Sequence, residues 1–546
     1  MNILEESKYA ISLIANKKYE EAEKIYLNLI NQAPNNTTIL AFTGLLYLQW
    51  NKINQAEEYF DRAYSIETSE MVTYNLAIIK EQLAKKEEAL ILYKELLNIN
   101  QKIEYYIKIT NLLINLTIFN DKNKYLKELD DYTKKGLNLY PRDKNIILNY
   151  SIGALYNQKK EEGEKYCKQA LKMDPQFSKA WAHLGLINEY VYSNEIEAQN
   201  CYKKAIKYNK NDNKPLYYDI AISYSKTNDF KKALYYFHKA LKLDPNNKTI
   251  LLGMAQCYFK QRKFKMGYKY YTRHTSIKYP DLKHLWDGKT HKDKTLFIYS
   301  DLGYGDQILY IRYLPYVAKK FKKVKIFVFS ELYELFKENY KEYPNIEFIK
   351  IETGIKYPEY DYSIVLSNLP YAIKKDFRHI PFSNKYINSE KTKTDIKNIG
   401  ICWQAGNSDI RTTIHRNIEI KEFEPIINIE KYNFFSLQVG ATIDEYKQYK
   451  NLKDLAKDFK DFTDTAEALK NIDLLITVDT SIANLAGAMG IKTFMLIPTY
   501  SDWRWFDNTE KTEWYDSITI FKQKIANSWI DEIKQIEGIL NNQIAQ

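Results

Sequence analysis

Small and aromatic residues return at nearly constant intervals along the first half of the chain. Ala22 and Ala56 are 34 positions apart, Pro141 and Pro175 are again 34 apart, and Pro245 follows 70 positions later. Such a period is typical of a repeated pair of helices, each of which can bury its apolar face only against its neighbours. The pattern therefore predicts an all-helical array of stacked helix pairs.

One repeat, residues 214–247, shows the pattern most clearly. Ala221 and Ala233 stand where two helices must touch. The residues that surround this contact and end the pair are Tyr224, Phe237, Ala240 and Pro245. The segment resembles the tetratricopeptide repeat (TPR), and we expect about eight such units between residues 3 and 279. The resemblance implies a superhelix whose groove holds an extended peptide or a protein partner.

After Pro280 the pattern changes to short β-rich runs with amphipathic segments or loops between them. Strands that alternate with helices predict right-handed βαβ units and parallel sheets. The expected strands are 294–300, 324–330, 346–351 and 362–367 in a first set, and 398–404, 432–438, 472–479, 492–498 and 517–523 in a second.

The two sets of strands, which separate near the polar stretch 388–395, suggest two doubly wound, Rossmann-like domains that face each other. We expect a multidomain chain with a TPR superhelix and two α/β halves, at residues 1–279, 280–394 and 395–546. An amphipathic C-terminal helix at 528–540 should pack on the α/β core and could cross between its halves. Ligands of such sheets bind beyond the carboxyl ends of the strands, so the residues that follow each strand are the functional candidates.

Composition narrows the class of function. The 546 residues carry a net charge of +11 with Lys and Glu interspersed, which favours a solvated surface over a nucleic-acid interface. The four cysteines form no CxxC pair, so neither a zinc site nor a disulfide framework is expected. The first residues lack a signal-peptide pattern, and no long apolar run is suited to a membrane span. We expect a cytoplasmic protein.

The first candidate site is the GxGD turn in "IYSDLGYGDQ" (298–307). Gly303 and Gly305 give backbone freedom and allow close approach, and Asp306 follows directly where a helix begins. A capping role for Asp306 is the structural alternative. The position at the end of the first strand, facing a second domain, favours a functional role.

Two further clusters follow strands of the second set. In "CWQAGNSDIRTTIHR" (402–416), Gly406 and Asn407 turn the chain, and the cationic or titratable side chains that follow are Arg411, His415 and Arg416. Guanidinium groups in this position suit a diphosphate, although a solvated basic loop would have the same composition. In "VDTSIANLAGAMG" (478–490), a strand ends at Asp479, and Thr480 and Ser481 open a helix that closes at Gly490. A helix start with hydroxyl groups can bind an anion, but Asp479 or Ser481 could also serve only as a cap.

These motifs, in this order, make the C-terminal half similar to the heptosyltransferase-like glycosyltransferases with the GT-B fold, in the branch fused to TPR repeats. The matching segments are the GxGD turn with "YIRYLP" (301–315), "CWQAGN" with "HRNIEI", "FFSLQVG" (434–440), "DFTDTAEAL" (461–469), "VDTSIANLAGAMG" and "DWRWF" (502–506). The resemblance covers roughly residues 295–523. Within "DWRWF" we interpret the tryptophans mainly as buried packing.

The resemblance implies an inverting, metal-independent transfer of a sugar from a nucleotide-sugar donor, without a cofactor. Asp306 matches the family's acid–base position, with Gly303 and Gly305 forming the turn on the acceptor side. The donor would be bound by the second domain, at Gly406, Asn407, Arg411, His415, Arg416, Gln438, Gly440, Asp479, Thr480, Ser481 and Asn484. Two positions depart from the family: Asn484 stands where relatives commonly have histidine, and Val439 where many have lysine.

Three functions stay open at this point. The first is a glycosyltransferase that modifies a polypeptide, for example flagellin or another surface protein, captured by the repeats. The second is transfer to a lipid-linked or saccharide acceptor, for which the stretch "VAKKFKKVKIF" (317–327) is a weak membrane-facing candidate. The third is an interaction scaffold whose transferase domain is catalytically weakened, consistent with Asn484 and Val439.

Overall fold

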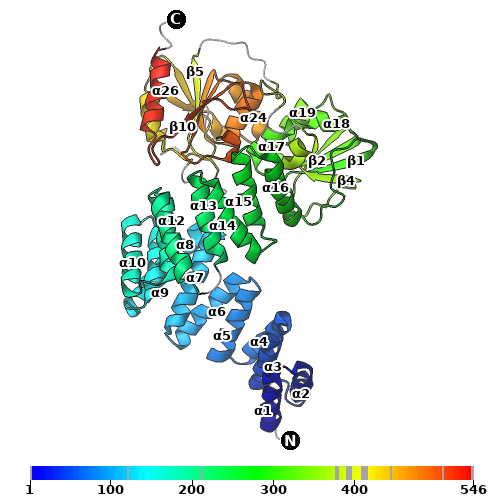
Figure 1. Cartoon of the computed structure of the whole chain (residues 1–546), viewed down its shortest axis with the longest axis vertical. Helices are drawn as coiled ribbons and strands as arrows, with labels where there is room; N and C mark the ends of the chain where they lie inside the picture. The colour runs from blue at the N-terminus through cyan, green and yellow to red at the C-terminus, as the bar shows by residue number, and fades with distance from the viewer. Residues whose placement is uncertain are drawn as a thin grey trace. The chain divides into compact units, whose positions relative to one another are not determined.

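The computed structural model describes residues 3–542 apart from 120–121, 211–212, 375–379, 389–395, 407–415, 443–445 and 507–509. The chain forms two compact units (Figure 1). The first contains residues 1–192 and 196–211, and the second contains 193–195 and 212–546. None of the helices in the described part combines the length and the hydropathy needed to cross a bilayer.

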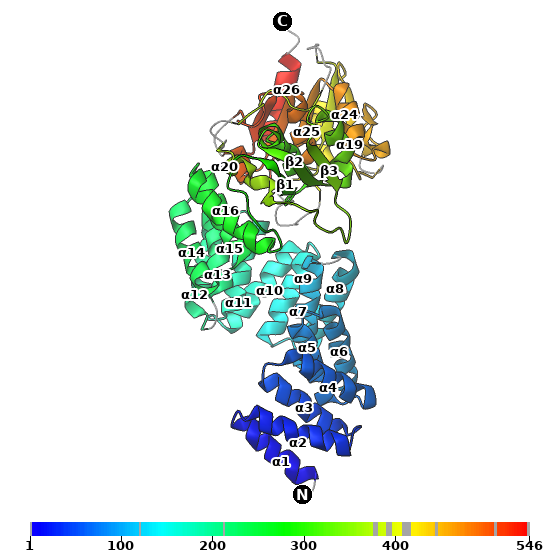
Figure 2. The same ribbon diagram turned by 90° about the vertical axis from the view of Figure 1, so that its right-hand side faces the viewer.

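The first unit consists of helices that pair with their sequence neighbours and then stack on the next pair (Figure 2). The helices are α1 (Ile3–Ala15), α2 (Tyr19–Gln32), α3 (Thr37–Gln49), α4 (Ile53–Ile66), α5 (Glu70–Gln82), α6 (Lys86–Ile99), α7 (Ile103–Phe119), α8 (Lys122–Leu139), α9 (Lys144–Tyr156), α10 (Lys160–Met173), α11 (Ser178–Leu186), the π-helical turn η1 (Ile187–Val191) and α12 (Glu195–Tyr208). Alanines and aromatic rings alternate in the contacts; Ala56 and Phe60, for example, are fully buried. Tyrosine hydroxyls at the margins donate to glutamates of other helices, as Tyr47 does to Glu23 at 2.7 Å.

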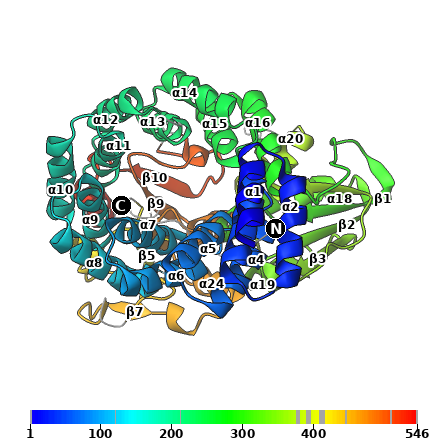
Figure 3. The same cartoon turned by 90° about the horizontal axis from the view of Figure 1, so that it is seen from below.

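Four more helices of the same kind open the second unit. They are α13 (Lys214–Lys226), α14 (Phe230–Leu243), α15 (Lys248–Lys260) and α16 (Phe264–Lys278). In the α13–α14 pair, Ala221, Ala233 and Phe237 are fully buried, as the sequence pattern predicts. Figure 3 shows the four helices following one another, with α16 next to α20 (Leu369–Ala372) of the α/β region.

Two fully parallel sheets follow. The first has the order β3-β2-β1-β4, and the second has the order β10-β9-β8-β5-β6-β7. The strands are β1 (His291–Tyr299), β2 (Phe321–Val328), β3 (Ile346–Lys350), β4 (Tyr362–Val365), β5 (Asn398–Cys402), β6 (Asn433–Ser436), β7 (Leu452–Asp454), β8 (Leu474–Val478), β9 (Thr493–Ile497) and β10 (Ile518–Lys522). All nine expected strands are confirmed; β7, at the sheet edge, has only three residues and was missed.

Besides α20, helices and short 3-10 turns connect these strands or follow the last of them. They are α17 (Tyr304–Ile311), α18 (Leu314–Ala318), α19 (Ser330–Asn339), η2 (Leu366–Asn368), η3 (Ile420–Phe423), α22 (Glu424–Ile427), η4 (Ala456–Asp458), α24 (Phe462–Lys470), α25 (Ser481–Met489), η5 (Trp503–Trp505) and α26 (Ile530–Asn542). The C-terminal helix α26 packs as expected on the α/β core. Its apolar face lies in the core cluster of the second sheet alone, so it does not cross between the halves.

One large core joins α15 and α16 to both sheets. It includes Phe259 and Tyr271 from these helices, Ile298 from β1 and Leu475 from β8. The buried Arg312, which follows α17, fastens the two α/β halves. It donates to the carbonyl of Trp514 at 2.8 Å and to the hydroxyl of Tyr386 at 3.1 Å.

The predicted domain boundary at 279/280 falls between the last repeat helix and β1. The compact units divide the chain earlier, near residue 212, because α15 and α16 share their core with the sheets. The predicted linker at 388–395 lies almost wholly outside the described residues.

Candidate functional site

The strand order of each sheet reverses at one point, where α/β proteins usually bind ligands beyond the carboxyl ends of the strands. In the second sheet this point lies between β5 and β8, and in the first sheet it lies between β1 and β4. The GxGD turn follows β1, and the Asp479–Ser481 segment follows β8. The predicted residues therefore occupy the positions that this rule favours.

Asp306 lies in the first turn of α17 and does not cap it. Gly303 is the N-cap residue, and no side chain caps the helix. The backbone N–H of Asp306 instead donates to the carbonyl of Gly303 at 3.1 Å. The capping alternative is therefore wrong for Asp306, whose side chain is 17% exposed.

Gly305 allows this contact to form. A Cβ atom placed on Gly305 would lie 2.9 Å from Nδ2 of Asn484 and 3.4 Å from the Cα of Ser481. At Gly303, by contrast, a Cβ atom would have no other atom within 4 Å, and the φ of −73° suits any residue. The GxGD turn therefore packs directly on the start of α25, and only the second glycine is required for that approach.

Arg504 in η5 binds the candidate carboxylate. Its guanidinium forms an ion pair with Asp306 and a second one with Asp502, where Nε and Oδ1 are 2.9 Å apart. Burial lowers the pKa of Arg504 to about 10, still well above neutral pH. Burial also raises the pKa of Asp502 to about 6, with a further contribution from nearby Asp479. The cation and the carboxylates form one charged cluster in a poorly hydrated place.

Asp479 lies on the other side of this cluster. The residue is 6% exposed, and its carboxylate is 3.7 Å from the guanidinium of Arg416. Burial raises the pKa of Asp479, and the Arg416 charge offsets part of that rise. Arg416 is thus the one described cation of the predicted basic loop, and the structure places it beside Asp479; Asn407, Arg411 and His415 lie outside the described residues.

Helix α25 begins and ends as predicted, with Thr480 as N-cap and Gly490 as a left-handed C-cap. Neither Asp479 nor Ser481 is its cap, and no side-chain hydrogen bond caps its first N–H groups. The hydroxyl of Thr480 lies 3.1 Å from that of Thr477 instead. The backbone N–H groups at the start of the helix, which lies against the GxGD turn, are therefore not taken by a capping side chain.

Asn484, predicted to bind the donor, is hydrogen-bonded within the second α/β half. Its Nδ2 donates to the carbonyl of Thr480 at 3.2 Å, and its Oδ1 accepts from the hydroxyl of Tyr515 at 3.0 Å. The amide is 7% exposed and lies close to the GxGD turn, because a Cβ atom on Gly305 would be 2.9 Å from its Nδ2.

Gln438 and Gly440 follow β6 at the margin of the site. The side-chain oxygen of Gln438 accepts from the backbone N–H groups of Trp403 at 3.1 Å and Gln404 at 2.8 Å, which ties the ends of β5 and β6. Gly440 has a φ of 79°, a left-handed conformation that favours glycine. Val439 is 62% exposed, and Gly406 is exposed, with open space where a Cβ atom would lie.

The last repeat helices support the same cluster. The ring of Phe259 in α15 lies 4.5 Å from that of Trp503, next to Arg504. The hydroxyl of Tyr271 in α16 donates to Asp301 at 3.1 Å, five residues before Asp306. The positive charge of Lys260 lowers the pKa of Asp502, although burial dominates. Periodicity alone gives no sign that repeat residues would reach this site.

Sequence reasoning missed Arg504 and Asp502. Both lie in the "DWRWF" motif, whose tryptophans are indeed largely buried, Trp505 at 2% exposure. An arginine and an aspartate between buried aromatic residues were the available signal, because charged side chains rarely enter a core without a partner.

The arrangement offers a carboxylate that can accept a proton, next to cations and to helix N–H groups that no capping side chain engages, which can stabilise negative charge. Among the described residues, no three His, Cys, Asp or Glu side chains are grouped so that they could hold a metal ion. Asp306 lines neither of two cavities that lie beside α16 and are considered below.

Comparisons with known proteins identify the repeats. Family models described as tetratricopeptide repeat match residues 215–247 and 39–69, which correspond to α13–α14 and α3–α4. A tetratricopeptide repeat protein from Parabacteroides merdae is similar with a TM-score of 0.41 and 16% identity, over 46% of this chain and 97% of that one. The C-terminal part of a TPR repeat-containing protein from Cytophaga hutchinsonii gives a TM-score of 0.32 and 18% identity, over 45% and 99% of the two chains.

A curated relative is human protein O-mannosyl-transferase TMTC3, 26% identical over 249 residues. The aligned part is 45% of this chain and spans only 27% of the length of that relative. Taken with the stacked helix pairs, the two family-model matches show that the chain contains tetratricopeptide repeats.

Proposed function

We propose that this chain is an inverting, metal-independent glycosyltransferase of the GT-B type, which moves a sugar from a nucleotide-sugar donor to a polypeptide held by the repeats. The observation that carries the proposal is the meeting of Asp306 with Arg504 and the start of α25. Segments that follow strands of two different parallel sheets come together there.

Each residue then has a chemical task. As the acceptor oxygen or nitrogen forms its bond to the anomeric carbon, the bond from that carbon to the phosphate oxygen breaks and the nucleoside diphosphate leaves. Asp306 accepts the proton of the acceptor group. Arg504, Arg416 and the α25 N–H groups stabilise the charge on the leaving diphosphate, a task that a metal has in other transferases.

The relative supports this proposal at a coarse level. Its name describes transfer of mannose to protein oxygen atoms, and this chain shares with it an aligned segment of 249 residues. A protein acceptor also gives a use to the repeats, whose helix pairs extend over the first 278 residues. A cytoplasmic location, and binding of nucleotide sugar in place of nucleic acid, belong to the same proposal.

The lipid-linked acceptor is less well supported. In the stretch 317–327, the apolar residues Phe321, Val324 and Ile326 are buried in β2, while Lys322 and Lys323 are exposed. The stretch runs from the end of α18 into β2, has solvated lysines, and offers no apolar face to a membrane.

The scaffold alternative draws on one observation, the ion pair that engages Asp306 with Arg504. Asp306→Asn separates the two accounts. With radiolabelled nucleotide sugars and a cell extract as source of acceptors, the wild-type chain should label protein, and the variant should do so about 10²- to 10⁴-fold more slowly. Asp131→Asn, at an exposed carboxylate of α8, is the matched control. Equal labelling by wild type and Asp306→Asn would reject the enzyme proposal, as would a wild-type chain that neither labels protein nor hydrolyses any donor.

A further inference from the structure

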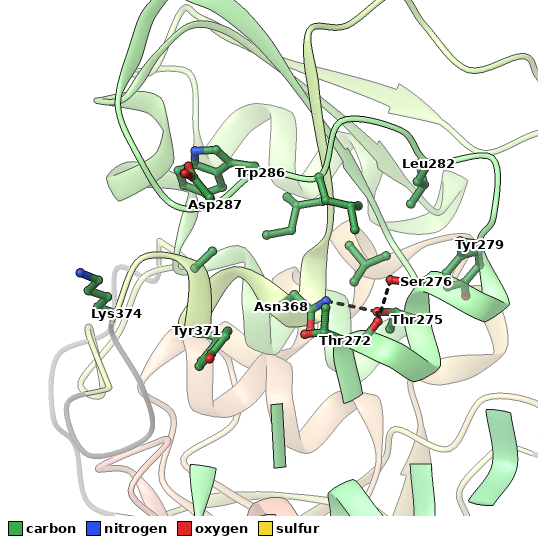
Figure 4. A pocket seen from close by; sticks show the side chains of 14 residues that line it. Thr272, Thr275, Ser276, Tyr279, Leu282, Trp286, Asp287, Asn368, Tyr371 and Lys374 are labelled. Carbon is green, nitrogen blue, oxygen red and sulfur yellow. Dashed lines mark hydrogen bonds between the residues drawn. The ribbon is translucent and has the colours of Figure 1, made fainter. Parts of the chain in front are cut away.

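A cavity of about 360 Å³ lies between α16 and the end of β4, outside the charged cluster (Figure 4). Its floor includes Ile364 and Val365 of β4 and Asn368 of η2. Because β4 is the neighbour of β1 at which the strand order of the first sheet reverses, this is a place where ligands of such sheets bind. Its volume lies at the small end of the range for ligand pockets.

The walls of this cavity are mainly apolar. Leu285 and Tyr371, at 51% and 44% exposure, lie at the solvent side of the cavity, whereas Trp286 and Leu282 are buried. The ring of Tyr371 is held by stacking on Tyr268, with centroids 4.8 Å apart. Such a lining suits an apolar or aromatic group of modest size better than a charged one.

Asn368 gives the cavity a polar position. The residue is 8% exposed, and its Nδ2 donates to the hydroxyl of Thr275 at 3.2 Å. Its Oδ1 is buried and has no hydrogen-bond partner among the described residues. A buried amide oxygen without a donor is unfavourable, so a ligand N–H group that this oxygen meets after the side chain turns toward the cavity would be bound in preference to a purely apolar group.

Lysines continue the surface beyond Tyr371. A second cavity of about 520 Å³ shares Tyr371 and Lys374 with the first and is also lined by Arg262, Lys263 and Lys265. Arg262 is paired with Glu513, but neither Lys265 nor Lys374 has an ion-pair partner in the described part of the chain. The apolar cavity is thus bordered by positive charge that a carboxylate could neutralise.

The cavity is also linked to the proposed catalytic turn. Tyr279, one of its lining residues, donates its hydroxyl to the carbonyl of Asp301 at 3.1 Å, and Ser367 donates to the Asp301 carboxylate. Five residues separate Asp301 from Asp306, and a chain of that length spans at most about 18 Å. An extended peptide with one side chain in the cavity could therefore reach Asp306 within several residues.

We propose that this cavity binds an apolar or aromatic side chain of the polypeptide acceptor, with an acidic residue of the same peptide on Lys265 and Lys374. Asn368 would accept from a peptide N–H. The identity of the ligand as an acceptor rests on the proposed function, whereas the binding of such a peptide does not require transfer.

The test uses the full chain, without nucleotide sugar, and a fluorescein-labelled nonapeptide with a central Phe, Gly and Ser on both sides of it, and two Asp at each end. Fluorescence anisotropy should show saturable binding. Replacing Phe by Ser in the probe should weaken binding about tenfold or more, because the buried ring is lost. Replacing the Asp residues by Ser should weaken it as well and remove most of its salt dependence.

Matched variants locate the site. Ser276 lines the cavity from an exposed position on α16, and Ser276→Trp should fill it and weaken binding about tenfold. Lys269→Trp places the same ring on an exposed position of α16 away from the cavity and should bind as wild type does. Lys374→Glu should weaken binding of the acidic probe and leave unchanged the binding of the probe in which Ser replaces the Asp residues. Thermal melting of each variant shows whether it is folded.

The outcomes are distinct. Equal binding of the original probe and of the probe in which Ser replaces Phe would overturn the cavity proposal. Equal binding by Ser276→Trp and Lys269→Trp would also overturn it, and so would saturable binding of maltotriose that Ser276→Trp abolishes. A parallel assay of nucleotide-sugar hydrolysis reports on the proposed function. If hydrolysis is intact while the peptide result fails, only the cavity proposal falls; if hydrolysis is absent while peptide binding holds, the transferase proposal falls.

Discussion

The repeat unit and the α/β unit each enclose a cation among carboxylates, and the two clusters differ in their contact with water. Lys80 in α5 lies 2.8 Å from Glu57, 3.2 Å from Asp61 and 3.0 Å from Glu88. The side chains of the last two are 48% and 55% exposed, whereas Glu57 is 13% exposed and has Lys85 as a second partner at 2.6 Å. Around Arg504, the Asp306 and Asp502 side chains are only 17% and 27% exposed. The first cluster ties neighbouring helices at a solvated surface.

This difference in exposure indicates which of the two clusters is the better candidate for a functional site. Ion pairs with solvated partners contribute little and are found wherever helices stack. An enclosed cluster of carboxylates around one cation, near the ends of strands, is the better candidate for a functional site, because perturbed titratable groups gather at such sites. The predictions below test this contrast, from the largest expected effect to the smallest.

Truncation should have the largest effect. A fragment starting at residue 280 lacks Phe259 and Tyr271, which belong to the core of the sheets, whereas a fragment starting at 213 keeps them. We expect the longer fragment to show a cooperative melting transition and the shorter one to be unfolded or aggregated. A stable, cooperatively melting 280–546 fragment would contradict the shared core.

Replacing the cation of each cluster should reduce the free energy of unfolding by different amounts. Arg504→Met leaves two enclosed carboxylates without their partner and should lower the free energy of unfolding of the α/β unit by about 3 kcal/mol. Lys80→Met should cost the repeat unit about 1 kcal/mol, because Asp61 and Glu88 can turn to water and the enclosed Glu57 keeps its second partner Lys85. Urea unfolding followed by circular dichroism measures both. Equal losses would show that enclosure makes no difference.

Acid should destabilise the repeat unit through His183. This residue is 9% exposed, contacts the Ser151 hydroxyl at 3.2 Å, and burial lowers its pKa from 6.5 to about 4. Burial disfavours the charged form of the His183 ring in the folded state. The contribution of the neutral ring to stability is therefore complete above pH 6.5, falls as the pH drops below that value, and is lost once the pH has fallen through 4. The loss should approach about 3 kcal/mol, at about 1.4 kcal/mol per pH unit.

His183→Gln keeps a hydrogen-bonding group and removes the titration. Its melting temperature should fall less than that of the wild type between pH 7 and pH 4. Parallel pH profiles for the two chains would show that His183 does not control this loss.

Glycine replacement should give the smallest effect. Gly305→Ala places a methyl group 2.9 Å from Asn484, so α17 and α25 must separate slightly, at a cost of about 1–2 kcal/mol and with slower sugar transfer. Gly303→Ala has open space at the same turn and should change stability by less than about 0.5 kcal/mol. Equal melting temperatures of the two variants would show that the Gly305 contact is unimportant.

Much of the fold could be predicted because it depends on local pattern. The alternation of small and aromatic residues predicted the repeats, and the short β-rich runs predicted the strands. The start of α25 at Thr480 and its end at Gly490 were also predicted. The edge strand β7 was missed because three residues carry too little pattern.

The candidate site could be predicted only in part. Asp306 and Asp479 follow strands, so topology pointed to them. Arg504 came into the site through a contact between distant segments, and Phe259 through the docking of a repeat helix on the sheets. Neither contact leaves a periodic or local signal in the sequence.

The central claim is that Asp306, Arg504, Arg416 and the start of α25 form a nucleotide-sugar site. Thermal melting of the full chain with a panel of nucleotide sugars at millimolar concentration tests it most directly, because a ligand that binds only the folded state raises the melting temperature. We expect at least one donor to raise the melting temperature of the wild type, and Arg416→Ala to lose most of that shift. A panel that leaves the wild type unshifted, or an equal shift in wild type and Arg416→Ala, would contradict the account.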